Sequence, residues 1–299
     1  MCPVVAVPFH PDGTLDLGAF ESVVSYLIAS GVSAVTLFGL ASEFHKLTDQ
    51  ERDLLASALL KQTRSERHVL ALLSVTDHAT EVAVERALAY VEAGADALMV
   101  LPPFFLSPTE AAIVEHVATV VSAVPVPVIV QYAPIQTGVR LDPETWVNLQ
   151  RDHPNLVAVK VETQPPGRYI TALREASAGT LGSLVGYAGV QLPDALRRGA
   201  AGVQPGCSFV EVYLTMIRRW DAGDEAGFAE IHSKLLPYVS YWMQNVELIV
   251  QAEKAILQHR GLIGSDRCRR PGYTLDAEEH WMIKRFMHEF AWLLSGDGG

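Results

Sequence analysis

The chain has 299 residues, of which 49% are hydrophobic, and its 34 acidic and 23 basic residues give a formal net charge of −11. This acidic balance excludes the broad basic surface that nucleic acids and anionic membranes require. No run approaches the roughly 20 apolar residues of a membrane span, and we expect no signal peptide. Three cysteines (Cys2, Cys207 and Cys268) without metal-ligand spacing indicate a reduced, cytoplasmic protein.

Short apolar runs rich in β-branched residues alternate with longer amphipathic segments over the first three quarters of the chain. Because these runs are apolar on both faces, they are typical of parallel strands that are buried on both sides. The predicted strands span residues 4–9, 34–38, 69–74, 97–101, 128–132, 156–161, 180–184 and 202–204.

Helix signals fill the spaces between the strands. Thr48 and Glu51 form a capping box, and Gly31, Gly94 and Gly199 each end a helix before a short turn and an apolar strand. Eight strand–helix units predict an α/β fold, the (β/α)8 TIM barrel. A doubly wound open sheet is the alternative, but the first strand is not followed by a glycine-rich dinucleotide loop.

The strand pattern ends after residue 221. Residues 225–238, 245–259 and 277–294 are predicted to form helices. We therefore expect a barrel over residues 1–222 and a C-terminal extension of three helices, residues 223–299, packed on the barrel.

A lysine interrupts the apolar run of residues 156–161, near the strand end where barrel active sites lie. Burial disfavours the ammonium form of Lys160 and makes the free amine a nucleophile toward a carbonyl carbon. An ion pair with Glu162 is the alternative, and the spacing alone does not separate the two interpretations.

Two other strand ends offer further polar groups, and the one at Tyr132 is expected to lie beside that of Lys160. Tyr132 could relay protons at the barrel mouth or serve as an aromatic plug. Glu43 is expected to be a buried structural carboxylate rather than a general base. The backbone N–H groups of Leu40 and Ala41 and the hydroxyl of Ser42 suit a substrate carboxylate, although an ordinary tight turn would look the same.

Several short sequence motifs occur along the chain. They are residues 7–9 with Asp12-Gly13, residues 39–43 with Leu47-Thr48, residues 102–105, Tyr132 with Thr137-Gly138, Lys160 with Glu162, and Arg270-Pro271. Together they resemble the dihydrodipicolinate synthase / N-acetylneuraminate lyase family of class I aldolases over nearly the whole length. The resemblance implies that Lys160 forms a Schiff base with pyruvate or another 2-oxo acid, that Tyr132 relays protons, and that the loop at Leu40 and Ala41 binds the carboxylate. It also implies no metal or organic cofactor, and a homotetramer or dimer.

The chain departs from the family pattern at positions that matter for the substrate. Leu40 and Ala41 stand where typical members carry hydroxyl groups, and Phe105 replaces a tyrosine of the hydroxyl relay. Gln136 replaces the arginine that anchors a second, dicarboxylate-forming substrate. We therefore predict an enzyme other than the lysine-pathway synthase, acting on a more apolar aldehyde or a sugar-acid-derived substrate. The predicted substrate-binding residues are Leu40, Ala41, Ser42, Phe105, Gln136, Gly186, Tyr187 and Gln204.

Four activities remain open at this point. A lyase that cleaves or forms a C–C bond next to a 2-oxo acid is the leading hypothesis, and a Schiff-base dehydratase or hydratase is the close rival. A non-catalytic barrel that binds a 2-oxo acid is the alternative from another class. A metal-dependent hydrolase ranks last, because His10, His45 and His78 form no ligand pair by spacing.

A catalytic role for Cys207 is not expected, because no histidine or acidic partner that could activate its thiol accompanies it in the sequence.

Overall fold

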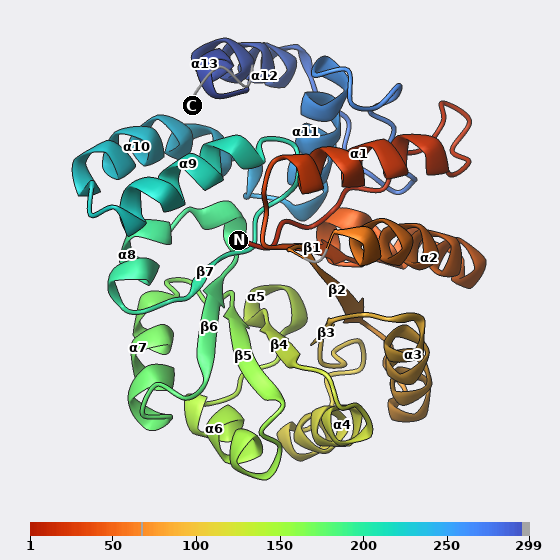
Figure 1. The fold of residues 1–299 in the computed structure, drawn as a ribbon, viewed down its shortest axis with the longest axis vertical. Helices are drawn as coiled ribbons and strands as arrows, with labels where there is room; N and C mark the ends of the chain where they lie inside the picture. Colours follow the sequence, from red (N-terminus) through yellow and green to blue (C-terminus); the bar gives the residue numbers. More distant parts are fainter. Residues whose placement is uncertain (67, 295–299) are drawn as a thin grey trace. The chain divides into compact units, whose positions relative to one another are not determined.

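A computed structural model describes residues 1–66 and 68–294. These residues belong to two compact units. The first unit combines Met1–Val69 with Pro205–Gly299, and the second is Leu70–Gln204. Figure 1 traces the elements of each unit along the chain.

The second unit contains six parallel strands, each hydrogen-bonded to the next in chain order. The strands are β2 (Leu70–Val75), β3 (Ala97–Val100), β4 (Val128–Tyr132), β5 (Leu156–Val161), β6 (Gly182–Val185) and β7 (Gly202–Val203). Between them lie α3 (Thr80–Ala93), α4 (Glu110–Ala123), α5 (Pro134–Thr137), α6 (Pro143–Asp152), α7 (Gly167–Ala176), the 3-10 turn η3 (Tyr187–Gly189) and α8 (Leu192–Arg197). Helices α3, α4, α6 and α7 cover the outward face of these strands (Figure 1).

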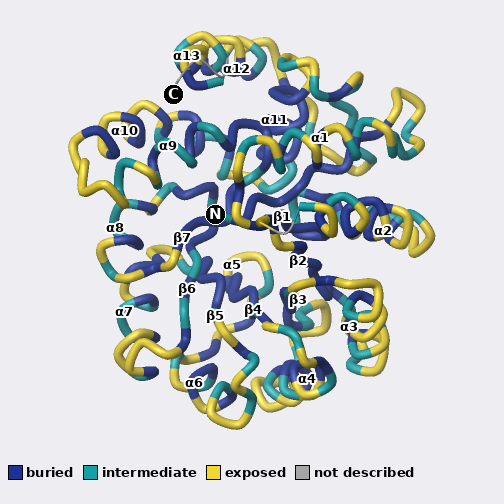
Figure 2. Tube along the Cα trace, viewed as in Figure 1, coloured by how far each residue is buried: buried dark blue, intermediate teal, exposed yellow. Residues whose placement is uncertain are grey.

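The apolar strands of this unit form its core. Leu98, Val130 and Val159 are fully buried on three neighbouring strands, and Figure 2 shows the strands mostly dark blue and the outer turns of the helices yellow. Gly94 ends α3 with a left-handed φ of 104°, as its place in the sequence predicted. All six strands predicted between residues 69 and 204 are present, and this alternation is consistent with a (β/α)8 barrel.

The first unit is mostly helical. Its elements before residue 70 are α1 (Leu17–Ala29), β1 (Ala34–Leu37), the 3-10 turns η1 (Leu40–Ser42) and η2 (Phe44–Lys46), and α2 (Asp49–Ser65). The predicted capping box of Thr48 and Glu51 opens α2. The strand predicted at residues 4–9 is wrong: isolated bridges join Val4 to Thr36 and Phe9 to Leu15. Pro8 has no N–H to donate to a ladder, which limits regular pairing there.

The remaining elements of the first unit are helices. They are α9 (Val210–Asp221), α10 (Glu225–Trp242), α11 (Val246–His259), α12 (Ala277–Glu289) and α13 (Ala291–Leu294). The predicted helices after residue 221 are confirmed, with a break at Phe290 in the last. Phe286 of α12 packs against Tyr238 and Trp242 of α10, at ring-centroid distances of 5.3 and 5.4 Å. The predicted division of the chain into residues 1–222 and 223–299 stays a prediction.

Helix length and polarity bear on membrane insertion. Within residues 1–66 and 68–294, every helix is too short or too polar to cross a bilayer.

Candidate active site

Lys160 lies near the carboxyl end of β5 and is 6% exposed. Its Nζ is 3.2 Å from Oε1 of Glu162, which is also buried. Both partners of this pair have therefore lost most of their hydration. The free-energy cost of this desolvation is offset only by a close opposite charge. The ion pair that the sequence left as an alternative is present, and it brings a carboxylate within reach of the amine.

Gln131 of β4 completes this arrangement. It is the register partner of Lys160, so the two side chains leave the sheet on the same face. Gln131 Nε2 donates a 2.7 Å hydrogen bond to Oε2 of Glu162. The carboxylate thus uses one oxygen for the amine and the other for the amide, which fixes its orientation. We call Lys160, Glu162 and Gln131 the lysine triad.

Gln131 was not among the site residues predicted from the sequence, although a signal was available. Like Lys160, it is a strongly polar residue inside an otherwise apolar strand. Two such residues on adjacent strands predict a shared buried site more strongly than either does alone.

Gly186, at the end of β6, makes room for the carboxylate. A Cβ atom at this position would lie 2.2 Å from Oε1 of Glu162, a distance that real side chains do not adopt. A predicted substrate-binding position therefore acts here first as a support for Glu162. Its N–H donates to the carbonyl of Val161 at 3.4 Å.

Tyr132 lies on the other face of the sheet. Its register partner is Val161, one position beyond Lys160, and side chains alternate along a strand. Its ring packs 4.7 Å from that of Tyr169, and its hydroxyl accepts the N–H of Leu141 at 3.0 Å. Burial raises the pKa of the Tyr132 phenol. The expected proximity of Tyr132 to Lys160 is therefore corrected, because strand parity turns the tyrosine toward the helices.

Gln136 and Tyr187, two of the predicted substrate-binding residues, contact each other. The amide of Gln136 and the hydroxyl of Tyr187 exchange hydrogen bonds of 2.8 and 3.1 Å. Tyr187 and the following Ala188 both have left-handed φ values, 50° and 47°, which are strained for residues with a Cβ. Burial, together with the charge of Glu162, raises the pKa of Tyr187. The turn that holds this phenol thus lies within electrostatic range of the lysine triad.

Other positions of the second unit differ in their availability. Ser74 is in register with Met99 of β3, and Met99 is in register with Ile129 of β4, so Ser74 lies on the same face of the sheet as Lys160. Its buried hydroxyl has no partner in the part of the chain that the structure describes. Gln204 is buried just after β7. Phe105, in contrast, is 78% exposed, and its predicted contact with substrate stays a prediction.

The loop at residues 40–43 belongs to the first unit. Its 3-10 turn uses the N–H groups of Ser42 and Glu43, which leaves those of Leu40 and Ala41 outside the turn's own hydrogen bonds. The Ser42 hydroxyl donates to the carbonyl of Val5 at 2.6 Å and accepts the N–H of Phe38 at 3.1 Å. Ser42 therefore holds the loop, and its expected role toward a substrate carboxylate is corrected.

Glu43 is completely buried in a network of charged groups. Its two oxygens form ion pairs with Lys254 and with Lys46, the latter at 3.2 Å. The backbone N–H of Arg269 donates to the same carboxylate at 3.1 Å. These contacts fit the structural role that the sequence predicted for Glu43.

The other nucleophile and metal candidates gain no support. Cys207 is buried, its Sγ accepts the N–H of Ala6 at 3.3 Å, and burial raises the pKa of its thiol to about 12. Its thiolate is therefore scarce at neutral pH. Across residues 1–66 and 68–294, the His, Cys, Asp and Glu side chains form no group of three that could hold a metal ion.

The chain is similar to known proteins over most of its length. The model of the Dihydrodipicolinate synthetase family matches residues 1–289. A 4-hydroxy-tetrahydrodipicolinate synthase of Kineococcus radiotolerans is 31% identical over 277 residues, covering 92% of this chain and 87% of the relative. An L-2-keto-3-deoxyarabonate dehydratase of Azospirillum brasilense is 27% identical over 274 residues, covering 90% and 87%.

Solved structures share the fold. The crystal structure of dihydrodipicolinate synthase from Rhodopseudomonas palustris has a TM-score of 0.87 and 24% identity, and 96% of each chain is covered. A prophage protein of the dihydrodipicolinic acid synthase family from E. coli K12, in complex with pyruvate, has a TM-score of 0.87 and 23% identity, with 97% of each chain covered.

Proposed function

This chain belongs to the dihydrodipicolinate synthetase family, whose members are lyases, and we propose that Lys160 forms a Schiff base with a 2-oxo acid. One observation carries the proposal: a buried amine lies 3.2 Å from a carboxylate that Gln131 holds in place. Such a pair supplies both a nucleophile and a group that moves protons. Pyruvate is the natural first probe, because the E. coli K12 structural neighbour was solved with it.

We assign the proton transfers of Schiff-base formation to Glu162. The carboxylate accepts a proton from the Lys160 ammonium. The free Nζ attacks the ketone carbon, and one of its protons passes to the ketone oxygen to give a carbinolamine. Glu162 then returns the proton to the carbinolamine hydroxyl, which leaves as water as the C=N bond forms. Because Gln131 donates to the far oxygen, the near oxygen stays directed at Nζ.

The step after the Schiff base is proposed to be loss of water from a hydroxylated 2-oxo acid. Elimination begins with removal of a proton from the carbon next to C=N, and a hydroxide group leaves one carbon farther along with a returned proton. A carboxylate that contacts the imine nitrogen is close to that first carbon. The dehydratase relative from Azospirillum brasilense agrees with this reaction class.

Reversible cleavage of a C–C bond is the second candidate. It needs a base at the substrate hydroxyl, which lies farther from the imine nitrogen than Glu162 does. The Tyr187 phenol, held by Gln136, is the group that favours this reaction. The synthase relative supports C–C bond chemistry as well. Because Gln136 replaces an arginine, we do not expect the lysine-pathway substrate.

Borohydride trapping tests the Schiff base. We expect incubation with pyruvate and borohydride to add one irreversible adduct, mapped to the Lys160 peptide by mass spectrometry. Lys160→Ala should abolish the adduct, while Lys234→Ala, an exposed lysine paired with Glu230, should leave it unchanged. If a panel of 2-oxo acids gives no adduct on Lys160, the non-catalytic binding barrel replaces this proposal.

Product analysis separates the two reaction classes. With a panel of hydroxylated 2-oxo acids, loss of one water with the carbon skeleton intact supports dehydration. Release of free pyruvate supports C–C cleavage. We also propose a homotetramer or dimer, as the family resemblance implies, and light scattering of the purified chain measures it.

A further inference from the structure

The first unit contains a pocket of about 550 Å³ that the proposed chemistry does not use. It lies along the loop between α11 and α12. Its lining includes Asp266, Arg267, Cys268, Arg270, Tyr273 and His280.

Helix α11 fixes the shape of this loop. Gln251, Lys254 and Gln258 lie at helical spacing on one face of α11, and each donates a side-chain hydrogen bond to a loop carbonyl. The acceptors are Asp266 at 2.9 Å, Arg267 at 3.0 Å and Gly264 at 3.3 Å, respectively. The backbone that carries Arg267 is therefore held in place before any ligand arrives.

Two arginines of this loop differ sharply in their contacts. The guanidinium of Arg269 bonds both oxygens of Glu51 and the carbonyls of Gly13 and Lys46. The guanidinium of Arg267 has neither hydrogen bond nor ion pair within the described ranges, and its Nε is buried without a partner. A desolvated donor of this kind is costly unless an acceptor binds it.

The charges around the pocket favour an anion. Arg267 and Arg270 bring two positive charges to the lining. Asp266 is the one carboxylate among the described lining residues, so the balance is positive although the whole chain carries −11. Arginine also matches carboxylate and phosphate geometry by donating two parallel bonds.

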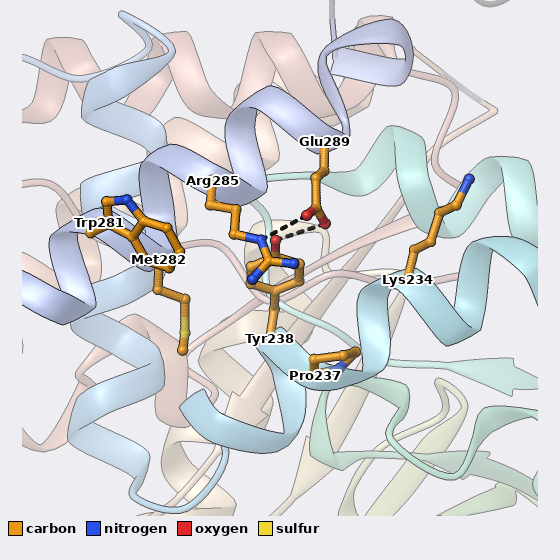
Figure 3. Close-up of a pocket in the computed structure, with 7 residues that line it drawn as sticks. All are labelled: Lys234, Pro237, Tyr238, Trp281, Met282, Arg285 and Glu289. Atoms are coloured by element: carbon orange, nitrogen blue, oxygen red, sulfur yellow. Dashed lines mark hydrogen bonds and ion pairs between the residues drawn. The ribbon is translucent and has the colours of Figure 1, made fainter.

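A second pocket of the first unit, about 470 Å³, shows the opposite situation. Figure 3 shows Arg285 and Tyr238 both directed at Glu289, with hydrogen bonds of 2.8 and 2.7 Å. Lys234 of the same pocket pairs with Glu230 at 2.8 Å. Its cations are already neutralised by protein carboxylates, so this pocket offers an anion little.

We propose that the pocket around Arg267 binds a small anion through a carboxylate or phosphate group, with Arg267 as its anchor. The ligand's oxygens accept hydrogen bonds from the Arg267 guanidinium. Arg270 adds attraction at the rim. Asp266 opposes binding and so limits the affinity.

Calorimetric titration of the full chain tests this site with two probes, inorganic phosphate and succinate. We expect saturable binding of at least one probe, and the responding probe identifies the anionic group. Arg267→Gln should weaken that binding about ten-fold or more, the effect of one lost charge-assisted bond. Asp266→Asn should tighten it several-fold by removing the opposing charge.

Two controls make the result specific. Lys160→Ala should leave the affinity unchanged, because the lysine triad is not involved. Lys234→Gln removes one positive charge at the pocket of Figure 3 and should also leave it unchanged. The proposal is overturned if neither probe binds saturably, if Lys160→Ala abolishes binding, or if Arg267→Gln and Lys234→Gln have equal effects. Should Arg267→Gln fail to fold, the Asp266→Asn titration decides, and unchanged affinity there would overturn it.

Discussion

The two units each contain a buried lysine paired with a glutamate, but the surroundings of the two amines differ. Lys254 Nζ forms an ion pair with Glu43, donates to the carbonyl of Arg267 at 3.0 Å, and lies 4.3 Å from the ring centroid of Phe9. Lys160 Nζ has Glu162 as its single polar partner in residues 1–66 and 68–294. An ammonium group has three N–H donors, so the first lysine is nearly saturated and the second is not.

We propose that this difference separates a structural lysine, Lys254, from a reactive one, Lys160. A saturated ammonium is held by every contact it makes, and losing its proton would break them. A buried amine with one carboxylate partner can release its proton to that partner and still point its lone pair at a substrate. Burial and pairing alone therefore do not identify a nucleophile, and the number of satisfied donors is the feature that distinguishes the two amines.

Exchanging each lysine for methionine should have opposite consequences. We expect Lys160→Met to lower turnover by about 10⁴-fold or more, because no nucleophile remains. Lys254→Met should instead cost about 3–5 kcal/mol of unfolding free energy, because Glu43 loses a fully buried counter-charge. Steady-state kinetics and urea denaturation of both variants measure this. Equal loss of stability in the two would remove the distinction.

Substituting the carboxylate of the lysine triad should impair the chemistry. We expect Glu162→Gln to lower kcat about 10²-fold or more with little change in KM, because general acid–base transfer is lost. Steady-state kinetics and stopped-flow measurement of Schiff-base formation check these values. A kcat close to the native value would show that Glu162 moves no proton.

The salt bridge between Arg269 and Glu51 predicts an acid-sensitive contribution to stability. The hydrogen bond from Arg269 lowers the pKa of Glu51 from 4.5 to about 2. This stability is fully present above the unfolded-state pKa and is lost as pH falls through the folded-state value. Glu51→Gln should therefore cost about 1–2 kcal/mol at neutral pH, after allowance for solvent screening. The difference from the native chain should vanish toward about pH 2 in chemical denaturation.

Removing the Tyr132 hydroxyl should have the smallest effect. Tyr132→Phe deletes the acceptor for the Leu141 N–H, which should cost about 1 kcal/mol of stability. We expect kcat to stay within about three-fold of the native value, because the phenol lies on the face opposite Lys160. A loss comparable to that of Glu162→Gln would return Tyr132 to the proton relay.

The alternation of strands and helices could be predicted from the sequence because buried strands and capped helices have strong local signals. The face that each strand residue occupies could not. In the run Val128–Tyr132, apolar residues stand on both faces, so the hydrophobic pattern does not reveal strand parity. Only the register with β5 shows that Gln131, and not Tyr132, accompanies Lys160.

Side-chain engagement was equally hidden from the sequence. Ser42 has a hydroxyl suited to a substrate, but this hydroxyl is hydrogen-bonded to the backbone of Val5 and Phe38. Arg267 and Arg269 stand two positions apart in one loop, and only the fold shows that one is saturated and the other is not. Such contacts depend on groups distant in sequence, which no local pattern records.

The loop held by Gln251, Lys254 and Gln258 has a consequence for local opening. The composition of this loop is typical of a mobile linker. However, three side chains of the buried helix α11 donate hydrogen bonds to its carbonyls. The backbone amides of the loop should therefore exchange with deuterium about as slowly as those of α11, because opening the loop would leave the three side-chain donors without acceptors. A stretch without regular secondary structure would then unfold together with the helix that holds it, as one cooperative segment.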